Sequence, residues 1–205
     1  MDRLKSTLII SFMGVDGSGK STLIYELRKK LSNKFKKIKY LHLRPYFFLY
    51  DKRTVNNNPH EKNSITQLES LIKILYWLFM YRFYFLINSK KKNNLIIFDR
   101  YAHDLLIDKV RYRFNLPKKI TKYILNLFPE PDLWVILKAP INIIEERKKE
   151  LSKNELKRQM KNYINFAKKK KNSITLDTRK KMKINIALIV KTFKTIIAKK
   201  KIIYK

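Results

Sequence analysis

The 205-residue sequence contains no cysteine. This absence excludes disulfide frameworks, thiolate metal sites and cysteine nucleophiles, and it fits a reducing compartment. Glycine is almost as rare, with only three occurrences. Hydrophobic residues make up 45% of the chain, which is enough to bury a full core without disulfides or a structural metal, so we expect residues 1–205 to form a single domain.

Acidic residues are also scarce, because 16 Asp and Glu stand against 48 Lys and Arg, and the formal net charge is +32. Such a charge favours nucleic acid or an anionic membrane surface as a partner. The abundance of Lys, Ile, Asn, Tyr and Phe has a competing explanation, since AT-rich codon usage produces the same bias regardless of function. From charge alone we expect non-specific polyanion binding at low salt.

The N-terminus shows no secretory signal, because its apolar run breaks into glycines and a charged loop. The membrane candidate Leu71–Ile87 is interrupted by Lys73 and Arg82. It also falls short of the roughly 20 apolar residues that a spanning helix needs. We expect a buried or half-buried helix there, no transmembrane segment, and a cytoplasmic protein.

Short apolar stretches alternate with helical patterns along the chain. The predicted strands are Thr7–Met13, Ile38–Leu43, Leu95–Phe98, Leu133–Leu137 and Ser173–Leu176. The predicted helices are Lys20–Leu31, Ile65–Asn88, Lys118–Leu127, Pro140–Lys170 and Lys183–Ile197. This alternation predicts an α/β fold, a three-layer sandwich with a five-stranded parallel sheet. The proline- and asparagine-containing segment Arg44–Ser64 predicts a long loop.

The sharpest motif is the segment Gly14–Thr22, which satisfies G-x-x-x-x-G-K-[ST] between a predicted strand and a predicted helix. It holds all three glycines of the protein, where the backbone must approach an anion closely. Backbone N–H groups and the helix N-terminus would bind the β-phosphate of ATP, while Lys20 reaches the β- and γ-phosphates and Ser21 ligates Mg²⁺. The predicted ATP-binding residues are Gly14, Asp16, Gly17, Ser18, Gly19, Lys20, Ser21 and Thr22.

Two carboxylates, one inside this motif and one at the end of a later strand, indicate a site for the phosphate acceptor. Asp16 lies inside the loop and would repel a triphosphate unless it faces something else, so we expect it to point toward an acceptor hydroxyl. Asp99 ends an apolar strand, where ligands bind in parallel α/β sheets, and could organise Mg²⁺ or its water. Arg100 follows directly, and its guanidinium could hold an acceptor phosphate in a bidentate way.

The order and spacing of four segments resemble the thymidylate kinase family over nearly the whole chain. These segments are GVDGSGKSTL, FDRY, PDLWVIL with the helix INIIEERKKE, and SITLDT before a C-terminal helix. The resemblance implies the P-loop NTPase fold, an acceptor-sugar contact at Asp16, and acceptor-phosphate contacts at Arg100 and Arg44. It also implies that Arg147 precedes a mobile lid near residues 147–158, and that the protein forms a homodimer.

The expected acceptor site departs from the family. Pro45 follows Arg44 directly, without the intervening Glu of the family, and Ala102–Phe114 replaces the family's thymine-recognition residues. This segment supplies carboxylates and guanidinium groups of its own, at Asp104, Asp108, Arg111 and Arg113. We assign Asp104 to the acceptor site, and the altered segment leaves the identity of the acceptor open.

The sequence therefore predicts an enzyme that uses ATP and Mg²⁺ to convert thymidylate to thymidine diphosphate, with Lys20, Asp99, Arg100 and Arg147 as catalytic residues and Ser21 and Asp99 as metal ligands. One alternative is a kinase of the same fold that acts on a sugar or glycan precursor. An alternative of another class is a basic nucleic-acid-binding P-loop ATPase. A third is a degenerate kinase that serves as a scaffold, since its C-terminal stretch is basic and amphipathic.

Overall fold

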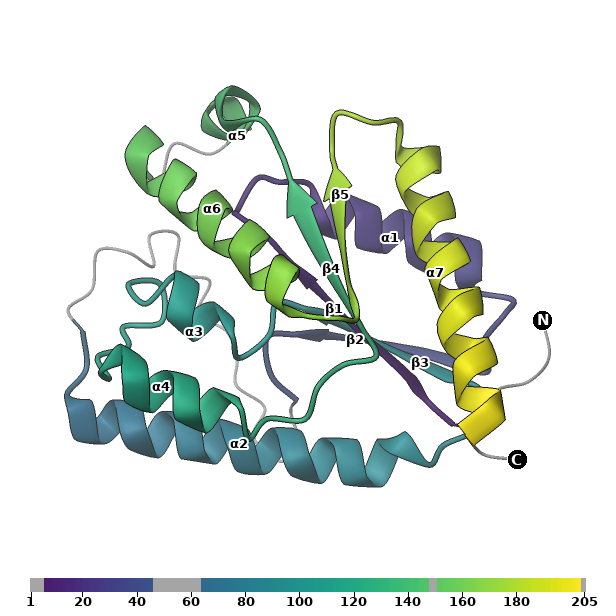
Figure 1. The fold of residues 1–205 in the computed structure, drawn as a ribbon, viewed down its shortest axis with the longest axis horizontal. Coiled ribbons are helices and arrows are strands. Elements are labelled where there is room, and N and C mark those ends of the chain that lie inside the picture. The colour runs from purple at the N-terminus through teal and green to yellow at the C-terminus, as the bar shows by residue number, and fades with distance from the viewer. Residues whose placement is uncertain (1–5, 46–63, 148–150, 204–205) are drawn as a thin grey trace.

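The computed structural model describes residues 6–45, 64–147 and 151–203, and its centre is a five-stranded parallel sheet (Figure 1). The strand order is β2-β3-β1-β4-β5. All five predicted strands are confirmed, with small shifts at their ends. Their bounds are β1 Leu8–Met13, β2 Lys37–His42, β3 Asn94–Asp99, β4 Leu133–Lys138 and β5 Ser173–Asp177.

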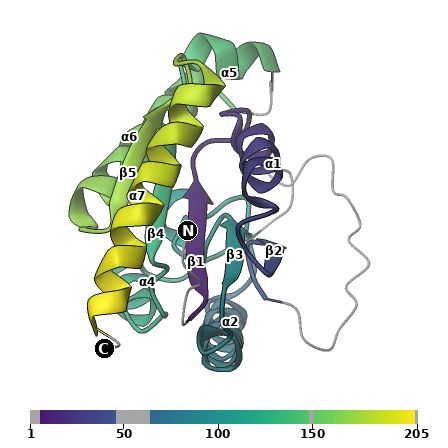
Figure 2. The same cartoon turned by 90° about the vertical axis from the view of Figure 1, so that its right-hand side faces the viewer.

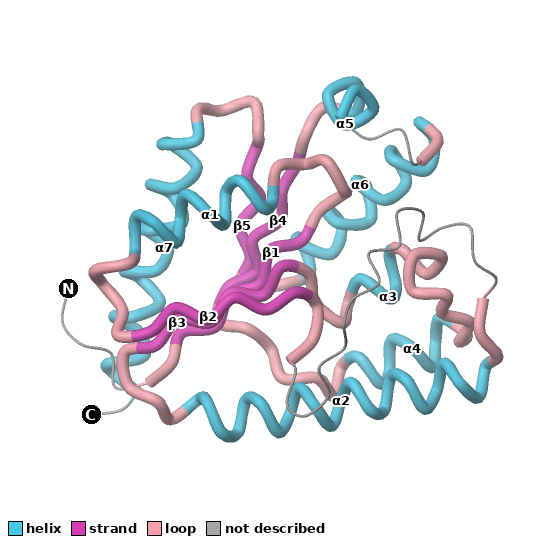
Figure 3. Tube along the Cα trace, turned by 180° about the vertical axis from the view of Figure 1, so that it is seen from behind, coloured by secondary structure: helices cyan, strands magenta, loops and turns pink. Residues whose placement is uncertain are grey.

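Helices cover both faces of the sheet, so the predicted three-layer α/β sandwich is confirmed. One face packs against α1 (Lys20–Leu31) and α7 (Met182–Ile203), and the other against α2 (Gln67–Ser89), α4 (Lys118–Leu125) and α6 (Lys153–Lys169). Figure 3 shows the strands running between these two groups of helices. Two short helices, α3 (Asp104–Ile107) and α5 (Ile141–Arg147), follow β3 and β4.

The first strand shows why the sheet is covered on both faces. Its side chains alternate between two separate apolar cores: Ile9 and Met13 pack with α2 and α6, whereas Leu8, Ile10 and Phe12 pack with α1 and α7. Successive side chains of a strand point to opposite faces, so a continuous apolar run needs cover on both. The glycine-containing loop that follows β1 therefore starts from a rigid, fully buried strand.

The long apolar helix α2 is half-buried, as predicted for Leu71–Ile87. Its inner face buries Trp77, Tyr81 and Tyr84 against the sheet. In Figure 2 it lies nearly end-on below the strands. Within the described residues it is the one helix that is long and apolar enough to cross a membrane by length and composition.

One predicted helix is wrong in its extent. The segment Pro140–Lys170 forms two helices, α5 and α6, rather than one. The break has a local cause, because the Ser152 hydroxyl accepts a hydrogen bond from the Glu155 backbone N–H at 3.3 Å and starts a new helix. Most of the predicted loop Arg44–Ser64 lies outside the described residues.

A capping box fixes the start of α2. The Thr66 hydroxyl accepts from the Glu69 backbone N–H at 3.2 Å, and the Glu69 carboxylate accepts from the Thr66 N–H at 2.8 Å. We predict that Thr66→Ala lowers stability by about 1 kcal/mol, because a helix N-terminus loses its cap. Thermal denaturation should show a melting temperature lower by roughly 2–4 °C. The control Thr195→Ala, at an exposed position within α7, should not lower it, and equal losses in both variants would contradict the prediction.

Candidate active site

The loop between β1 and α1 depends on its glycines. Gly14, Gly17 and Gly19 all have positive φ angles, of 151°, 78° and 89°. A Cβ atom on Gly14 would lie 3.0 Å from the Leu137 carbonyl oxygen, so a larger residue would collide with β4. Only glycine adopts this path without strain, which leaves the backbone N–H groups of the loop at the N-terminus of α1.

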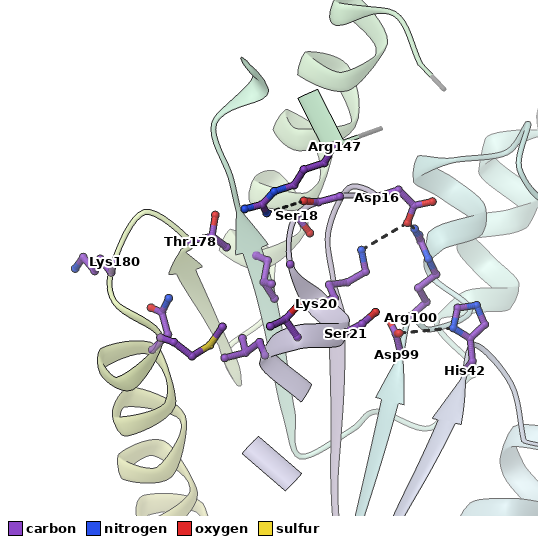
Figure 4. Close-up of a pocket in the computed structure, with 17 residues that line it drawn as sticks. Asp16, Ser18, Lys20, Ser21, His42, Asp99, Arg100, Arg147, Thr178 and Lys180 are labelled. Carbon is purple, nitrogen blue, oxygen red and sulfur yellow. Dashed lines mark hydrogen bonds and ion pairs between the residues drawn. The ribbon is translucent and has the colours of Figure 1, made fainter. Parts of the chain in front are cut away.

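A cavity of about 490 Å³ opens beside this loop at the C-terminal ends of the strands (Figure 4). Nearly all of the predicted phosphate-loop residues line it, together with Asp99, Arg100 and Arg147. Three predicted site residues, Gly14, Arg44 and Asp104, do not line it. The lining residues are Asp16, Gly17, Ser18, Gly19, Lys20, Ser21, Thr22, Leu23, His42, Asp99, Arg100, Leu137, Arg147, Thr178, Lys180, Met182 and Asn185.

Lys20 folds back onto its own loop. Its ammonium group donates to the carbonyl oxygens of Gly14 at 2.8 Å and Val15 at 2.9 Å, and lies 3.8 Å from the Asp16 carboxylate. Burial, followed by the positive charge of Arg100, lowers the pKa of Lys20 to about 8. A lysine held in this way is close enough to the cavity to transfer its hydrogen bonds to phosphate oxygens.

Asp16 is held between two arginines. One carboxylate oxygen pairs with Arg100 and the other with Arg111, and the three side chains join the phosphate loop to the segments after β3. Sequence reasoning expected Asp16 to face an acceptor hydroxyl. The structure places two guanidinium groups against it, which offsets the negative charge that would repel a triphosphate, and the contact with an acceptor hydroxyl stays a prediction.

Arg100 lines the cavity and is buried in a polar network. Its Nη1 donates to Asp104 at 2.6 Å and lies 3.4 Å from the Tyr163 hydroxyl, while Nη2 pairs with Asp16. Burial alone would lower the pKa of Arg100, but the surrounding Tyr112, Asp104, Tyr163 and Asp16 raise it well above the ordinary value. Its backbone φ is +74°, an uncommon conformation for a residue other than glycine that is concentrated at functional sites.

The predicted acceptor residue Asp104 belongs to the same network. Its carboxylate accepts from Arg100, from the Tyr112 hydroxyl at 3.2 Å and from the Tyr163 hydroxyl at 3.1 Å, and its side chain is fully buried. Burial, followed by the negative charge of Asp104, raises the pKa of Tyr163 well above its ordinary value, so the hydroxyl stays protonated and can donate. The structure thus uses Asp104 to fix Arg100.

Asp99 presents an oxygen that could accept a further ligand. Its Oδ2 accepts from the Tyr40 hydroxyl at 2.8 Å and lies 3.7 Å from His42, whereas Oδ1 is buried and has no hydrogen-bond partner among the described residues. Burial would raise the pKa of Asp99, but His42, Lys20 and Tyr40 together hold it below its ordinary value. An ionised carboxylate oxygen of this kind, lining the phosphate cavity, suits a cation or its bound water.

The oxygen donors fit a magnesium site that is completed by phosphates. In residues 6–45, 64–147 and 151–203 no group of three His, Cys, Asp or Glu side chains could hold a metal ion by itself. Mg²⁺ usually keeps several waters and is bound through one or two protein oxygens plus substrate phosphates. Ser21 and Asp99 both line the cavity and supply such oxygens.

The side of the cavity beside β5 and α7 was missed by sequence reasoning. Thr178 and Lys180 follow β5, and Met182 and Asn185 begin α7. The Asn185 side-chain amide donates to the Asp177 carbonyl at 3.0 Å and fixes this turn. The rule that ligands bind at the carboxyl ends of parallel strands, applied to the last strand as well, could have found these residues.

Arg44 lies in a separate group of cations outside the cavity. Its guanidinium lies 5.9 Å from the centre of the Trp77 ring, and Lys73 lies 5.6 Å from the same ring. Burial, followed by the charge of Arg44, lowers the pKa of Lys73 to about 8, and the ammonium donates to the Tyr112 carbonyl at 2.7 Å. The structure therefore brings Lys20, Asp99, Arg100 and Arg147 together, but leaves Arg44 apart from them.

The pKa of Lys20 makes ATP affinity dependent on pH. Bound phosphates stabilise the charged ammonium and so raise its pKa from about 8, which means that binding takes up a proton at higher pH. We predict that the affinity for ATP, measured by calorimetry without an acceptor, falls about tenfold between about pH 7 and about pH 9.

The matched variant Lys20→Arg keeps its charge over this range. Its residual affinity, although weaker than that of the natural protein, should not change with pH. A natural protein that binds ATP equally well at both ends of the range would show that Lys20 is not the titrating group.

Comparison with known proteins gives structural but not sequence matches. No protein-family model matches the chain, and no curated protein matches its sequence. Among solved structures, thymidylate kinase from Candida albicans matches with a TM-score of 0.63 and 17% identity, over 95% of this chain and 93% of that one. Thymidylate kinase from Ehrlichia chaffeensis matches with a TM-score of 0.57 and 17% identity, over 91% and 98%.

A third solved structure is deoxyadenosine kinase from M. mycoides with bound dATP. It matches with a TM-score of 0.57 and 19% identity, over 91% of this chain and 99% of that one. The parallel sheet, the glycine loop between β1 and α1 and these full-length matches agree with each other. The chain is thymidylate kinase-like in structure and has the α/β P-loop NTPase fold.

Proposed function

We propose that this protein transfers the γ-phosphoryl group of ATP to a nucleoside monophosphate, in the manner of a thymidylate kinase, so that thymidylate and ATP give thymidine diphosphate and ADP. The observation that carries the proposal is the convergence of Lys20, Asp99 and the Asp16–Arg100 pair on one cavity beside the phosphate loop. The structural matches to two thymidylate kinases and a deoxyadenosine kinase support a nucleotide or nucleoside as the acceptor.

Phosphoryl transfer depends mainly on alignment and on neutralising charge, and the proposed roles follow from position. Lys20 would move its hydrogen bonds from Gly14 and Val15 to the β- and γ-phosphates. Mg²⁺, bound through Ser21 and with its water oriented by Asp99, would offset charge on the phosphate oxygens.

Arg147 is the proposed closing cation. Its guanidinium lies 3.3 Å from the Gly17 carbonyl oxygen, so it already reaches over the phosphate loop. We propose that residues 1–205 act as one kinase domain and that the stretch near 147–158, where α5 gives way to α6, closes over the phosphates. Closure of such a segment would exclude water and limit wasteful hydrolysis of ATP.

A second candidate is a kinase of the same mechanism that acts on a sugar or glycan precursor. The observation in its favour is the acceptor segment Ala102–Phe114, in which Asp104 and Arg111 serve the ion-pair network around Arg100 and Asp16. That arrangement contains no feature specific to thymine. The two candidates share the ATP site and differ only in the acceptor.

An acceptor panel tests the proposal. ADP release from Mg-ATP should be strongly stimulated by thymidylate or another nucleoside monophosphate, and less by nucleosides, sugars or sugar phosphates. Lys20→Met should abolish this turnover, because it removes the charge that contacts the phosphates. Turnover with a sugar alone would establish the second candidate, and stimulation by single-stranded DNA alone would indicate an ATPase instead of a kinase.

We also propose that two copies of the chain associate through the outer face of α2, which runs along one edge of the molecule (Figure 1). A row of exposed apolar residues follows this face with successive spacings of four, three, four and seven residues, and their exposed fractions are between 46% and 66%: Leu68, Ile72, Leu75, Phe79 and Leu86. Such spacing forms the seam between two packed helices.

The two cationic side chains of α2 are directed away from this row. Lys73 turns to the Tyr112 carbonyl, and Arg82 donates to the Leu127 carbonyl at 2.9 and 3.1 Å. A seam without charge is suited to another apolar helix, and a second α2 related by a two-fold axis presents the same surface. An apolar row of this length is larger than the scattered exposed side chains of ordinary monomers.

Light scattering during size-exclusion chromatography tests the association. The natural protein should elute as a dimer and Phe79→Asp as a monomer, because a charge at the centre of the seam would be desolvated on association. The control Tyr25→Asp also replaces an exposed aromatic residue by a carboxylate, but on α1, and it should remain dimeric. A monomeric natural protein would refute the proposal, and loss of vesicle binding in Phe79→Asp would then identify the row as a lipid-binding surface.

A further inference from the structure

Arg111 lies beside the candidate active site, and the packing of the fold does not require its side chain. It lies in the irregular segment between α3 and α4, and its Nη1 pairs with Asp16 of the phosphate loop. Its side chain keeps 20% of its surface exposed. Among the described residues, its only ion pair is with Asp16, through Nη1.

Arg100 has the opposite surroundings. Its side chain is only 3% exposed, and both terminal nitrogens already pair with carboxylates, Nη1 with Asp104 and Nη2 with Asp16. A phosphate held in a bidentate way by the two terminal nitrogens of Arg100 would compete with these buried pairs. Removing one partner from a buried ion pair leaves an uncompensated charge and is strongly unfavourable.

We propose that Arg111, and not Arg100, binds the anionic group of the acceptor, and that Arg100 is a positioning residue that holds Asp16. This inference rests on the proposed kinase function and specifies its substrate class, an acceptor that already carries a phosphate. On binding, the Arg111 guanidinium exchanges the single Asp16 carboxylate for phosphate oxygens, which match its planar donors in a bidentate way.

The backbone around Arg111 is held while its side chain can move. The Arg111 N–H donates to the Asp108 carboxylate at 3.3 Å, and the next residue, Tyr112, is buried with its hydroxyl on Asp104. Hydrogen bonds from the backbone of Arg113 to Val110 and of Phe114 to Lys109 close the turn. A guanidinium on a fixed backbone loses little further entropy when it changes partner.

Asp16 would then couple the binding sites of the two substrates. In the structure it balances Arg100, Arg111 and Lys20 at once, with the Lys20 ammonium 3.8 Å away. When Arg111 leaves for the acceptor, Asp16 stays paired with the buried Arg100 and keeps its place in the loop. The acceptor hydroxyl that the sequence predicts for Asp16 could take the position that Arg111 leaves.

Calorimetry on the whole protein tests the inference with two matched ligand pairs, thymidylate with thymidine and adenylate with adenosine. Arg111→Gln should weaken binding of the preferred monophosphate about 10- to 100-fold, the loss expected for charge-assisted hydrogen bonds. Binding of the matching nucleoside should change less than about twofold. Arg111→Lys should restore part of the loss, because the charge returns without the planar fork.

Lys122→Gln is the matched control, since it removes one positive charge from the exposed surface of α4 and should leave all affinities unchanged. Equal weakening of monophosphate and nucleoside by Arg111→Gln would overturn the inference, as would an unchanged monophosphate affinity. So would a natural protein that binds neither monophosphate more tightly than its nucleoside.

Turnover separates this inference from the proposed function. In kinase assays Arg111→Gln should raise KM for the monophosphate more than KM for ATP. A natural protein that phosphorylates only neutral acceptors would keep the kinase proposal and refute the role of Arg111. A natural protein without any transfer would refute the kinase proposal, and the calorimetric comparison would still decide whether Arg111 binds the phosphate.

Discussion

The carboxylate of Asp16, held between Arg100 and Arg111, is the interaction on which the site depends. It joins the phosphate loop after β1 to the end of β3 and to the segment that follows α3. Asp104 and Tyr163 extend the same network to α6. Because these charges are largely withdrawn from water, each needs its partner, and the elements that carry them can adopt only a narrow range of relative positions.

The network also reconciles two opposing requirements of an ATP site. Lys20 must stay charged to bind phosphate, yet burial and Arg100 lower its pKa to about 8. Asp16 and Asp99 oppose this shift by their negative charge, and Asp99 is itself kept ionised by His42, Lys20 and Tyr40. Two of the sixteen acidic residues of this very basic chain, Asp16 and Asp99, therefore counterbalance the cations that would bind the triphosphate.

The sequence was most informative where the chemistry depends on residues that are neighbours in the chain. The strand, glycine loop and helix around Gly14–Thr22 could be predicted because one short motif fixes both conformation and chemistry. The sheet could be predicted because β1, β3 and β4 are short apolar runs, while β2 and β5 alternate apolar with polar residues. The division of Pro140–Lys170 into two helices was missed although the Ser152 and Glu155 signal is local, since the charged residues around it are all good helix formers.

What the sequence determined by itself is the layered α/β fold and the phosphate loop, because both follow from periodicity and from residues that are neighbours in the chain. Tertiary structure alone decided which charges meet. Asp16 lies 84 positions from Arg100 and 95 positions from Arg111 in the sequence. Asp104 lies 59 positions from Tyr163. Pairing over such separations is set by how helices pack on the sheet, so no local pattern shows that Arg100 is enclosed while Arg111 stays partly exposed beside the cavity.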